Sequence, residues 1–256
     1  MPQSDTSWGE VADWYHEMLE DNPDSYQRRV ILPNLLRVLE LKQGQTVLDL
    51  ACGQGFFSRE FAKAGVRVVG ADLAEPLIAL AKRQPVPRGS TSPTYYAAPA
   101  DRIPQVADAS VDKVVIVLAL QNIENAPAVL QETNRVLKPR GELFIVLNHP
   151  AFRVPQASAW GFDGTKLQFR RIERYLSDDK VKIQMRPGAD PTVRTVTFHR
   201  PLQGYFKMLR KAGLCVTRLE EWISHRQSQR GPRAAAEDRA RKEIPLFLML
   251  QAAKYT

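Results

Sequence analysis

Strand-like and helix-like patterns of apolar and polar positions alternate through the middle of the chain. Short runs typical of buried strands occupy residues 46–50, 67–72, 94–98, 113–118 and 142–147. Apolar positions with helical spacing lie between them, over 56–64, 74–82 and 127–137. This alternation predicts right-handed β-α-β crossovers and an α/β domain with a mainly parallel sheet.

Two helices are expected before the first strand. Apolar residues recur at helical spacing at Trp8, Val11, Ala12, Tyr15 and Leu19. The chain breaks at Asn22-Pro23-Asp24, and Ser25 is placed to cap a second helix that runs to Leu39. The N-terminal segment is therefore predicted to be helical.

The alternation breaks after residue 148. Residues 149–200 begin with a loop rich in Pro, Gly and aromatic residues and continue with alternating runs at 181–186 and 193–198. Because Pro187-Gly188-Ala189-Asp190-Pro191 separates these runs, they predict a β-hairpin insertion. The α/β pattern then resumes with a helix at 202–211, a strand at 214–219, a polar loop with a short helix at 224–243, and a last strand at 244–253.

The composition narrows the class of protein. A chain of 256 residues fits one large α/β domain. No apolar run approaches the roughly 18 residues that span a bilayer, and the first residues lack the basic start and apolar core of a signal peptide. Cys52 and Cys215 lie far apart without metal-ligating neighbours, so we expect two buried thiols, no metal site and a cytoplasmic protein.

The net charge of +8 is unevenly distributed along the chain. Residues 152–211 contain thirteen Lys or Arg and five Asp or Glu, an excess that equals the net charge. Such a region could attract RNA or an anionic small substrate. Its arginines are scattered and lack regularly spaced stacking aromatics, which favours a solvated basic face and leaves RNA as the second possibility.

Residues 46–58 contain the main candidate for a ligand site. A short buried strand has Asp49 near its end, and Gly53 and Gly55 follow before a helical run begins. Glycines let backbone N–H groups approach a ligand closely, so this order of strand, turn and helix predicts a nucleotide-type site. Asp72 closes the next strand, where a carboxylate can accept both hydroxyls of a ribose.

The larger set of motifs identifies the type of nucleotide. An NAD fingerprint asks for a third glycine where this chain has Ser58, so a dehydrogenase is disfavoured. The chain instead resembles the class I S-adenosylmethionine-dependent methyltransferases, in particular the small-molecule branch of the ubiquinone and menaquinone methyltransferase type. The matching segments lie within residues 46–148, in family order, at Val47 to Gly55, Asp72, Ala100 to Pro104, Asp108 to Asp112 and Arg135 to Gly141.

The resemblance implies a Rossmann-like, doubly wound α/β fold with a mainly parallel seven-stranded sheet. We expect a single domain over 1–256, made of an N-terminal helical cap at 1–45, a cofactor-binding core at 46–148, an acceptor-side insertion at 149–200 and the C-terminal part of the sheet at 201–256. The hairpin insertion and the N-terminal helices are expected to form a lid over the acceptor.

The resemblance also implies which residues hold the first part of the cofactor. Gly53 and Gly55 would bring backbone against the methionine part. Asp72 would hold the ribose hydroxyls, with Leu73 against the adenine ring. Asp49 is expected to order the loop behind the ligand.

Further cofactor residues follow the third and fourth strands. Asp101 would accept from the adenine exocyclic amine, beside Arg102. Val117 and Leu118 would border the methionine and the sulfonium, and Gln121 would lie near the reacting methyl group. The implied set is completed by Ala51 and Ala100.

Acceptor residues should come from segments over the strand ends. His149 is the leading candidate for a general base, because an imidazole titrates near working pH; the alternative is a loop histidine bonded to backbone. His199 and Tyr15 are the other catalytic candidates. The predicted substrate-binding residues are Tyr26, Asn148, Arg153 and Arg200, of which the two arginines could clamp a carboxylate or phosphate.

Three functions remain open from the sequence. The first is methyl transfer from S-adenosylmethionine to an O, C or N atom of a small-molecule acceptor, which could be an anion. The second is an RNA methyltransferase, motivated by the basic segment at 152–211. The third is a non-catalytic S-adenosylmethionine-binding protein. The identity of the acceptor and the oligomeric state stay open.

Overall fold

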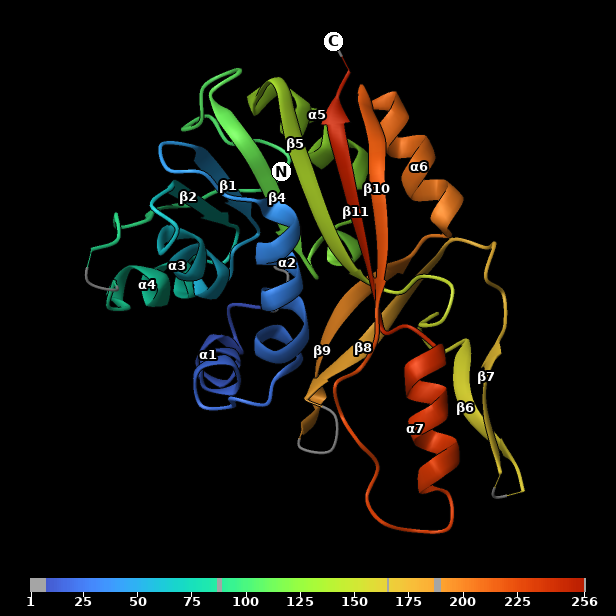
Figure 1. Ribbon diagram of the computed structural model, residues 1–256. Helices are drawn as coiled ribbons and strands as arrows, with labels where there is room; N and C mark the ends of the chain where they lie inside the picture. The colour runs from blue at the N-terminus through green and yellow to red at the C-terminus, as the bar shows by residue number, and fades with distance from the viewer. Residues whose placement is uncertain (1–7, 87–88, 165, 187–189, 256) are drawn as a thin grey trace.

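A seven-stranded sheet runs through the protein in the computed structural model, which describes residues 8–86, 89–164, 166–186 and 190–255 (Figure 1). Its spatial order is β10-β11-β5-β4-β1-β2-β3. The strands are β1 (Thr46–Leu50), β2 (Arg67–Asp72), β3 (Thr94–Ala97), β4 (Val111–Val117), β5 (Leu137–Asn148), β10 (Leu214–Trp222) and β11 (Phe247–Lys254). All neighbouring pairs are parallel except those of β11, which runs antiparallel to β5 and β10. The predicted Rossmann-like, mainly parallel sheet is confirmed.

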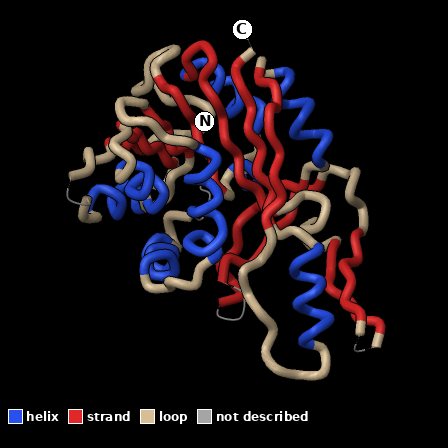
Figure 2. Tube along the Cα trace, in the orientation of Figure 1, coloured by secondary structure: helices blue, strands red, loops and turns tan. Residues whose placement is uncertain are grey.

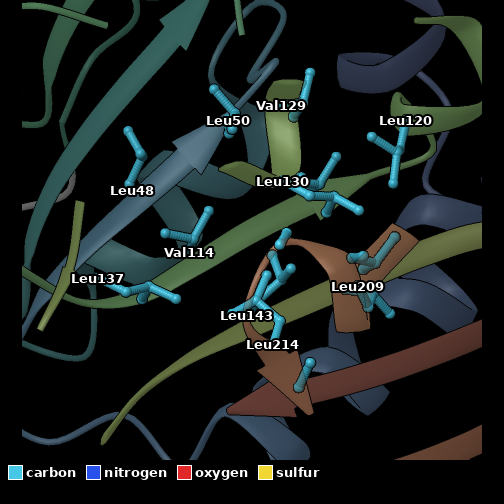
Figure 3. Close-up of a cluster of buried hydrophobic side chains, with 14 of the residues drawn as sticks. Leu48, Leu50, Val114, Leu120, Val129, Leu130, Leu137, Leu143, Leu209 and Leu214 are labelled. Atoms are coloured by element: carbon cyan, nitrogen blue, oxygen red, sulfur yellow. The ribbon is translucent and has the colours of Figure 1, made fainter. Parts of the chain in front are cut away.

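Apolar side chains alternate between the two faces of the sheet, and each face has its own core. Helices α5 (Ala126–Val136) and α6 (Leu202–Lys211) cover one face. Figure 3 shows this core, which includes Leu48, Val114, Leu130, Leu143 and Leu209. Helices α2 (Leu32–Leu39) and α3 (Phe56–Ala62) cover the other face, with a core that includes Leu35, Val47, Phe61, Val115 and Phe144. Each such fully buried side chain stabilises the fold by roughly 1.5–3 kcal/mol.

The chain changes direction across the sheet at β1. From β1 it moves outward to β2 and then β3, with α4 (Glu75–Arg83) between them, and then returns to β4 on the other side of β1. The carboxyl ends of β1, β2 and β4 therefore meet at a topological switch point, where open α/β sheets bind their ligands.

The N-terminal segment is helical as predicted. Helix α1 (Ala12–Glu20) is followed by a π-helical turn at Gln27–Ile31 that leads directly into α2. The backbone N–H of Arg28 donates to Ser25 Oγ at 3.4 Å, so Ser25 caps the second helical segment. The π-helical turn is a local feature that the apolar spacing did not predict.

The insertion after β5 contains two hairpins rather than one. The predicted hairpin is confirmed as β8 (Asp179–Arg186) paired with β9 (Asp190–His199), and its turn at 187–189 lies outside the described residues. The preceding stretch was expected to be a loop, and that expectation was wrong. It forms β6 (Ser158–Asp163) and β7 (Leu167–Ile172), and the short helix predicted in the polar stretch, α7 (Ala234–Glu243), packs against β7 (Figures 1 and 2).

The two cysteines differ in exposure. Cys52 is buried, as expected, but Cys215 is exposed because it lies on the edge strand β10 with its side chain away from the core. The expectation of two buried thiols was therefore wrong for Cys215. Within the described residues, no helix is long and apolar enough to cross a membrane, and no cluster of His, Cys, Asp and Glu could hold a metal ion.

Candidate functional site

The glycine turn after β1 forms the floor of the candidate site. Gly53 and Gly55 have φ of +56° and +76°, in the left-handed region that glycine adopts without strain. The backbone N–H of Gly55 donates to Cys52 O at 3.0 Å, and Gly55 is also the residue at which α3 begins. A Cβ on Gly55 would lie 2.4 Å from Tyr95 Oη, so this position excludes every side chain. The N–H of Gly55 is thus used inside the turn, and the two glycines present backbone without side chains at the site.

Asp72 connects the end of β2 to this turn. Its carboxylate accepts from Gly53 N–H at 2.8 Å and from Ala74 N–H at 2.9 Å. Burial raises the pKa of Asp72, and the two N–H donors oppose that rise. The carboxylate thus has a fixed orientation beside the glycine turn, and a carboxylate has enough lone pairs to accept from two further hydroxyls.

Asp49 lies beneath the turn and away from solvent. It is 1% exposed and accepts a hydrogen bond from Ser58 Oγ at 2.6 Å. Burial raises its pKa to about 7, mainly because a charged carboxylate is poorly solvated there. Ser58, which replaces the third glycine of the NAD fingerprint, therefore ties α3 to β1.

Helix α1 packs on the glycine turn through Tyr15. The Tyr15 ring approaches within 3.4 Å of the position of a Cβ on Gly53, and Trp8 packs edge-on against Tyr15 at 5.3 Å between centroids. Ala12 of the same helix packs against Ala74 and Leu77 at the start of α4. Burial raises the pKa of the Tyr15 phenol, and the nearby carboxylates of Asp72 and Asp49 raise it further. The phenol is therefore neutral and can act as a hydrogen-bond donor.

A buried polar network attaches α1 to the glycine turn. The Arg59 side chain on α3 is 10% exposed and forms an ion pair with Glu20 at the end of α1. The same guanidinium donates to the Gln54 backbone carbonyl at 2.8 Å, between the two glycines, and Glu20 also pairs with Arg28 at 3.0 Å. Nothing in the local sequence indicated these contacts, because they join residues that are far apart in the chain.

The residues predicted to surround the adenine follow β2 and β3. Leu73 and Ala100 are half-buried, and Asp101 and Arg102 are exposed. The backbone N–H of Ala98 donates to Asp72 O at 2.9 Å, which holds this loop beside the end of β2. The structure thus places the start of this loop beside Asp72, and the adenine-binding roles of these residues stay predictions.

The residues predicted near the methyl group lie at the end of β4. Leu118 has φ of +53° and Ala51, after β1, has φ of +58°. Such backbone costs on the order of 1 kcal/mol or more in residues other than glycine and is typical of ligand sites. Val117 and Leu118 are half-buried, and Gln121, on the short helix Leu120–Asn122, accepts from Asn148 N–H at 3.3 Å. Gln121 therefore joins the ends of β4 and β5.

His149 is fully engaged in hydrogen bonds. Its Nδ1 accepts from Ala151 N–H at 3.2 Å, so its Nε2 bears the proton and donates to Glu221 Oε1 at 2.7 Å. Burial lowers the pKa of His149, and the Glu221 carboxylate opposes that effect. A general base needs a free lone pair, so the predicted catalytic role of His149 requires the ring to leave this arrangement. That role stays a prediction.

His199 and Arg200, at the end of β9, hold two different loop segments, the one before β8 and the one after β4. His199 is 4% exposed, and its Nε2 donates to Tyr175 O at 2.8 Å. Arg200 Nη2 donates to the carbonyls of Ile123 and Glu124 at 2.9 and 2.8 Å. These contacts hold the two side chains against backbone, and their predicted catalytic and substrate-binding roles stay predictions.

Tyr26, Asn148 and Arg153 surround the ends of β5 and β11. The Tyr26 hydroxyl hydrogen-bonds Ser224 Oγ at 3.2 Å, and its ring packs edge-on against Phe247 of β11. Asn148, which pairs with Phe247 in the sheet, is exposed, and Arg153 is half-buried. The structure thus brings three of the four predicted substrate-binding residues together where β5 ends and β11 begins. The carboxyl end of β5 lies at the same end of the sheet as the carboxyl ends of β1, β2 and β4.

Comparison with known proteins identifies the cofactor-binding region. Residues 48–145 match the family model described as a methyltransferase domain, and this range contains the glycine turn, Asp72, Asp101 and Gln121. The match covers less than half of the chain and assigns this part of it to a methyltransferase domain. This family uses S-adenosylmethionine as methyl donor.

Curated relatives of this chain act on different acceptors by name. It is 33% identical over 150 residues to a demethylmenaquinone methyltransferase of Beutenbergia cavernae, covering 59% of this chain and 58% of the relative. It is 28% identical over 182 residues to a malonyl-[acyl-carrier protein] O-methyltransferase of Pectobacterium atrosepticum, covering 71% of this chain and 66% of the relative. The chain thus spans less than two thirds of the length of these relatives.

A solved structure supports the fold of this chain over most of its length. It is that of an S-adenosylmethionine-dependent methyltransferase from Mesorhizobium loti, with a TM-score of 0.68 and 24% identity. The match covers 90% of this chain and 98% of that chain. The similarity therefore extends beyond the family model into the insertion and the C-terminal strands.

Sequence reasoning missed several side chains around the candidate site. Glu221 was not recognised as the partner of His149, because the two residues lie on different strands. Trp160 and Arg170 were missed because β6 and β7 were expected to be a loop. The sequence did contain a signal for that hairpin, since Asp163-Gly164 stands between two runs of alternating aromatic and polar residues.

Proposed function

We propose that this protein transfers a methyl group from S-adenosylmethionine to a small-molecule acceptor. The observation that carries the proposal is the fixed orientation of the Asp72 carboxylate beside Gly53 and Gly55, two residues without side chains. All three lie at the switch point of the sheet. This donor and acceptor set fits the cofactor: Asp72 can accept from the ribose hydroxyls, and the turn admits the methionine part against backbone. When bound, S-adenosylmethionine supplies a methyl group activated by the positive sulfonium.

The protein's own residues then have to orient the acceptor and exclude water. Tyr15 covers the glycine turn, and α1 is attached to that turn through Glu20 and Arg59. Leu118 and Tyr26 pack against the same apolar cluster beside β5 and β11, which offers a dry surface for the acceptor. We infer that these apolar side chains limit the access of water to the approaching acceptor atom.

The basic segment at 152–211 does not favour RNA as the acceptor. Several of its cations are already paired, as Arg171 is with Glu173 at 2.9 Å and Lys180 with Glu124 at 3.0 Å. Pairing reduces the number of charges available to phosphates, on which the affinity for nucleic acid depends. The names of the curated relatives also support a small-molecule acceptor, although they describe different acceptors.

A transfer assay with a labelled methyl group tests the proposal. The protein is incubated with methyl-labelled S-adenosylmethionine and, separately, with a fraction of small metabolites and with total RNA. We expect label in the metabolite fraction. Label in RNA alone would overturn the proposed acceptor class, and binding of the cofactor without transfer to either fraction would support a non-catalytic binding protein instead.

A further inference from the structure

Two arginines lie over one indole ring in the first hairpin of the insertion. The guanidinium carbon of Arg153 is 5.4 Å from the centroid of Trp160, and that of Arg170 is 5.3 Å from the same centroid. Cation–π contacts of this kind hold a planar guanidinium in a defined place. Two positive charges therefore meet at Trp160 of β6, one from Arg170 of β7 and one from Arg153 in the segment between β5 and β6.

These charges lack counter-ions in the described part of the protein. No carboxylate there lies within 4.0 Å of either guanidinium, whereas the next arginine, Arg171, is paired with Glu173. Arg170 donates to Phe152 O at 2.8 Å and to Ser158 Oγ at 2.6 Å. By contrast, the Nε of Arg153 is buried without a hydrogen-bond partner. An unpaired, partly buried cation is unfavourable unless a ligand supplies the missing charge.

The pKa shifts of Arg153 and Arg170 agree with two partly buried cations that lack a counter-ion. Burial, and after it the neighbouring positive charge of Arg170, lower the pKa of Arg153 to about 10, while the Tyr26 phenol opposes the effect. Burial also lowers the pKa of Arg170. Binding of an anion would relieve both effects, because it would add a negative charge to a site that has only positive ones.

Arg153 is connected to the end of the cofactor site by a short chain of contacts. Its backbone N–H donates to His149 O at 2.8 Å, and the adjacent Asn148 N–H donates to Gln121 Oε1 at 3.3 Å. Gln121 follows Leu118 at the end of β4. Arg200, the other arginine considered for substrate binding, already donates from Nη2 to two backbone carbonyls. Although Nη1 of Arg200 is also buried without a partner, the two arginines differ, because the Arg153 side chain donates no hydrogen bond within the described residues.

We propose that Arg153 binds an anionic group of the methyl acceptor, a carboxylate or a phosphate, and that Trp160 and Arg170 hold Arg153 in place for it. The proposal rests on the proposed function, because it assigns the anion to the acceptor of that reaction. A guanidinium can bind either anion through two parallel N–H donors. Arg153 is thus a binding residue, and Trp160 and Arg170 are positioning residues.

Calorimetric titration with matched small probes tests this site. The probes are benzoate, phenyl phosphate and uncharged benzyl alcohol, each added to protein saturated with S-adenosylhomocysteine. We expect at least one anion to bind about tenfold or more tightly than benzyl alcohol, in line with a charge-assisted hydrogen bond. The difference between benzoate and phenyl phosphate then distinguishes a carboxylate from a phosphate as the preferred group.

Variants connect the preference for anions to Arg153. Arg153→Gln should abolish the preference, and Arg153→Lys should retain part of it because it keeps the charge without the planar donor pair. Arg171→Gln, on the same hairpin, is the matched control and should change the affinities by less than about twofold. Unchanged binding of S-adenosylhomocysteine by each variant shows that the fold is intact.

Two results would overturn the proposal: equal binding of anions and benzyl alcohol by the unmodified protein, or an unchanged preference in Arg153→Gln. A failure of the proposed function gives a different result, because S-adenosylhomocysteine then does not bind. In that case the same anion titration without S-adenosylhomocysteine still reports on Arg153 by itself.

Discussion

Gly53 and Asp72 are joined by a hydrogen bond from the backbone N–H of the glycine to Oδ2 of the carboxylate, at 2.8 Å. The bond connects the turn after β1 to the end of β2, so two separate elements of the cofactor site share one orientation. A second bond, from Ala74 N–H to Oδ1 at 2.9 Å, fixes the other carboxylate oxygen. Each oxygen of the Asp72 carboxylate therefore accepts one backbone N–H and still has a lone pair for a ligand.

Asp72→Asn should weaken binding of S-adenosylhomocysteine by tenfold or more. The amide retains one acceptor oxygen but loses the charge and one of the two acceptors that a ribose needs, a loss of about 1.5–3 kcal/mol. Titration calorimetry measures the effect. Asp163→Asn, an exposed change at the end of β6, is the control and should leave the affinity unchanged. Equal affinity in the Asp72 variant would remove this residue from the cofactor site.

Gly55→Ala should destabilise the protein more than Gly44→Ala. Both glycines have positive φ, +76° and +86°, so both substitutions introduce backbone strain of about 1 kcal/mol. Only at Gly55 would the new Cβ also collide with Tyr95 Oη, because nothing lies within 4 Å of a Cβ at Gly44. Urea unfolding should therefore show an additional loss of about 1–3 kcal/mol for Gly55→Ala. Equal losses would contradict the close packing of Tyr95 under the turn.

Arg59→Ala should lower the free energy of unfolding by about 3 kcal/mol. The substitution leaves the partly buried Glu20 without this partner and removes the donor to the Gln54 carbonyl. Lys63→Ala, in an exposed i,i+3 pair with Glu60, is the matched control and should cost less than about 0.5 kcal/mol. Amide hydrogen exchange should show faster exchange in α1 of the Arg59 variant. Unchanged exchange there would mean that the ion pair does not hold α1 on the glycine turn.

Asp49→Asn should reduce the loss of stability that the protein shows as pH rises. The pKa of Asp49 is raised to about 7 in the folded protein, above the value of about 3.9 in an unfolded chain. Between these values the folded state binds more protons than the unfolded state, so the contribution of Asp49 to stability is complete below about pH 4 and decreases until pH 7. From pH 5 to pH 8 this contribution falls by at most about 3 kcal/mol.

The asparagine variant has no such proton to lose, and its amide oxygen can still accept from Ser58. Its stability relative to the unmodified protein should therefore increase from pH 5 to pH 8. Urea unfolding of both proteins at several pH values in this range measures the difference. A constant difference over the range would show that Asp49 does not titrate with a raised pKa.

The sheet could be predicted from the sequence because its strands are buried on both faces. Val114, Val115 and Ile116 form an apolar run that fits only the middle of a sheet, and β4 occupies that place. The β6–β7 hairpin was missed since most of its residues are exposed or half-buried, and its alternation has no apolar core to mark it. Similarly, the exposure of Cys215 depends on the edge position of β10, which no local pattern shows.

The candidate site could be predicted where its chemistry is local and not where it depends on contacts across the fold. Gly53, Gly55 and Asp72 lie at strand ends that the sequence pattern places together. The buried pair of Glu20 with Arg59 joins residues 39 positions apart, and His149 meets Glu221 72 positions away. Whether an arginine is free to bind an anion depends on such distant partners, so the sequence could not distinguish Arg153 from Arg200.

Calorimetric titration of the unmodified protein with S-adenosylhomocysteine tests the central claim most directly. The account predicts that one molecule of S-adenosylhomocysteine binds per chain and that S-adenosylmethionine competes with it. NAD should not compete, because Ser58 stands where an NAD fingerprint has its third glycine. Absence of binding to S-adenosylhomocysteine, or displacement by NAD, would contradict the account.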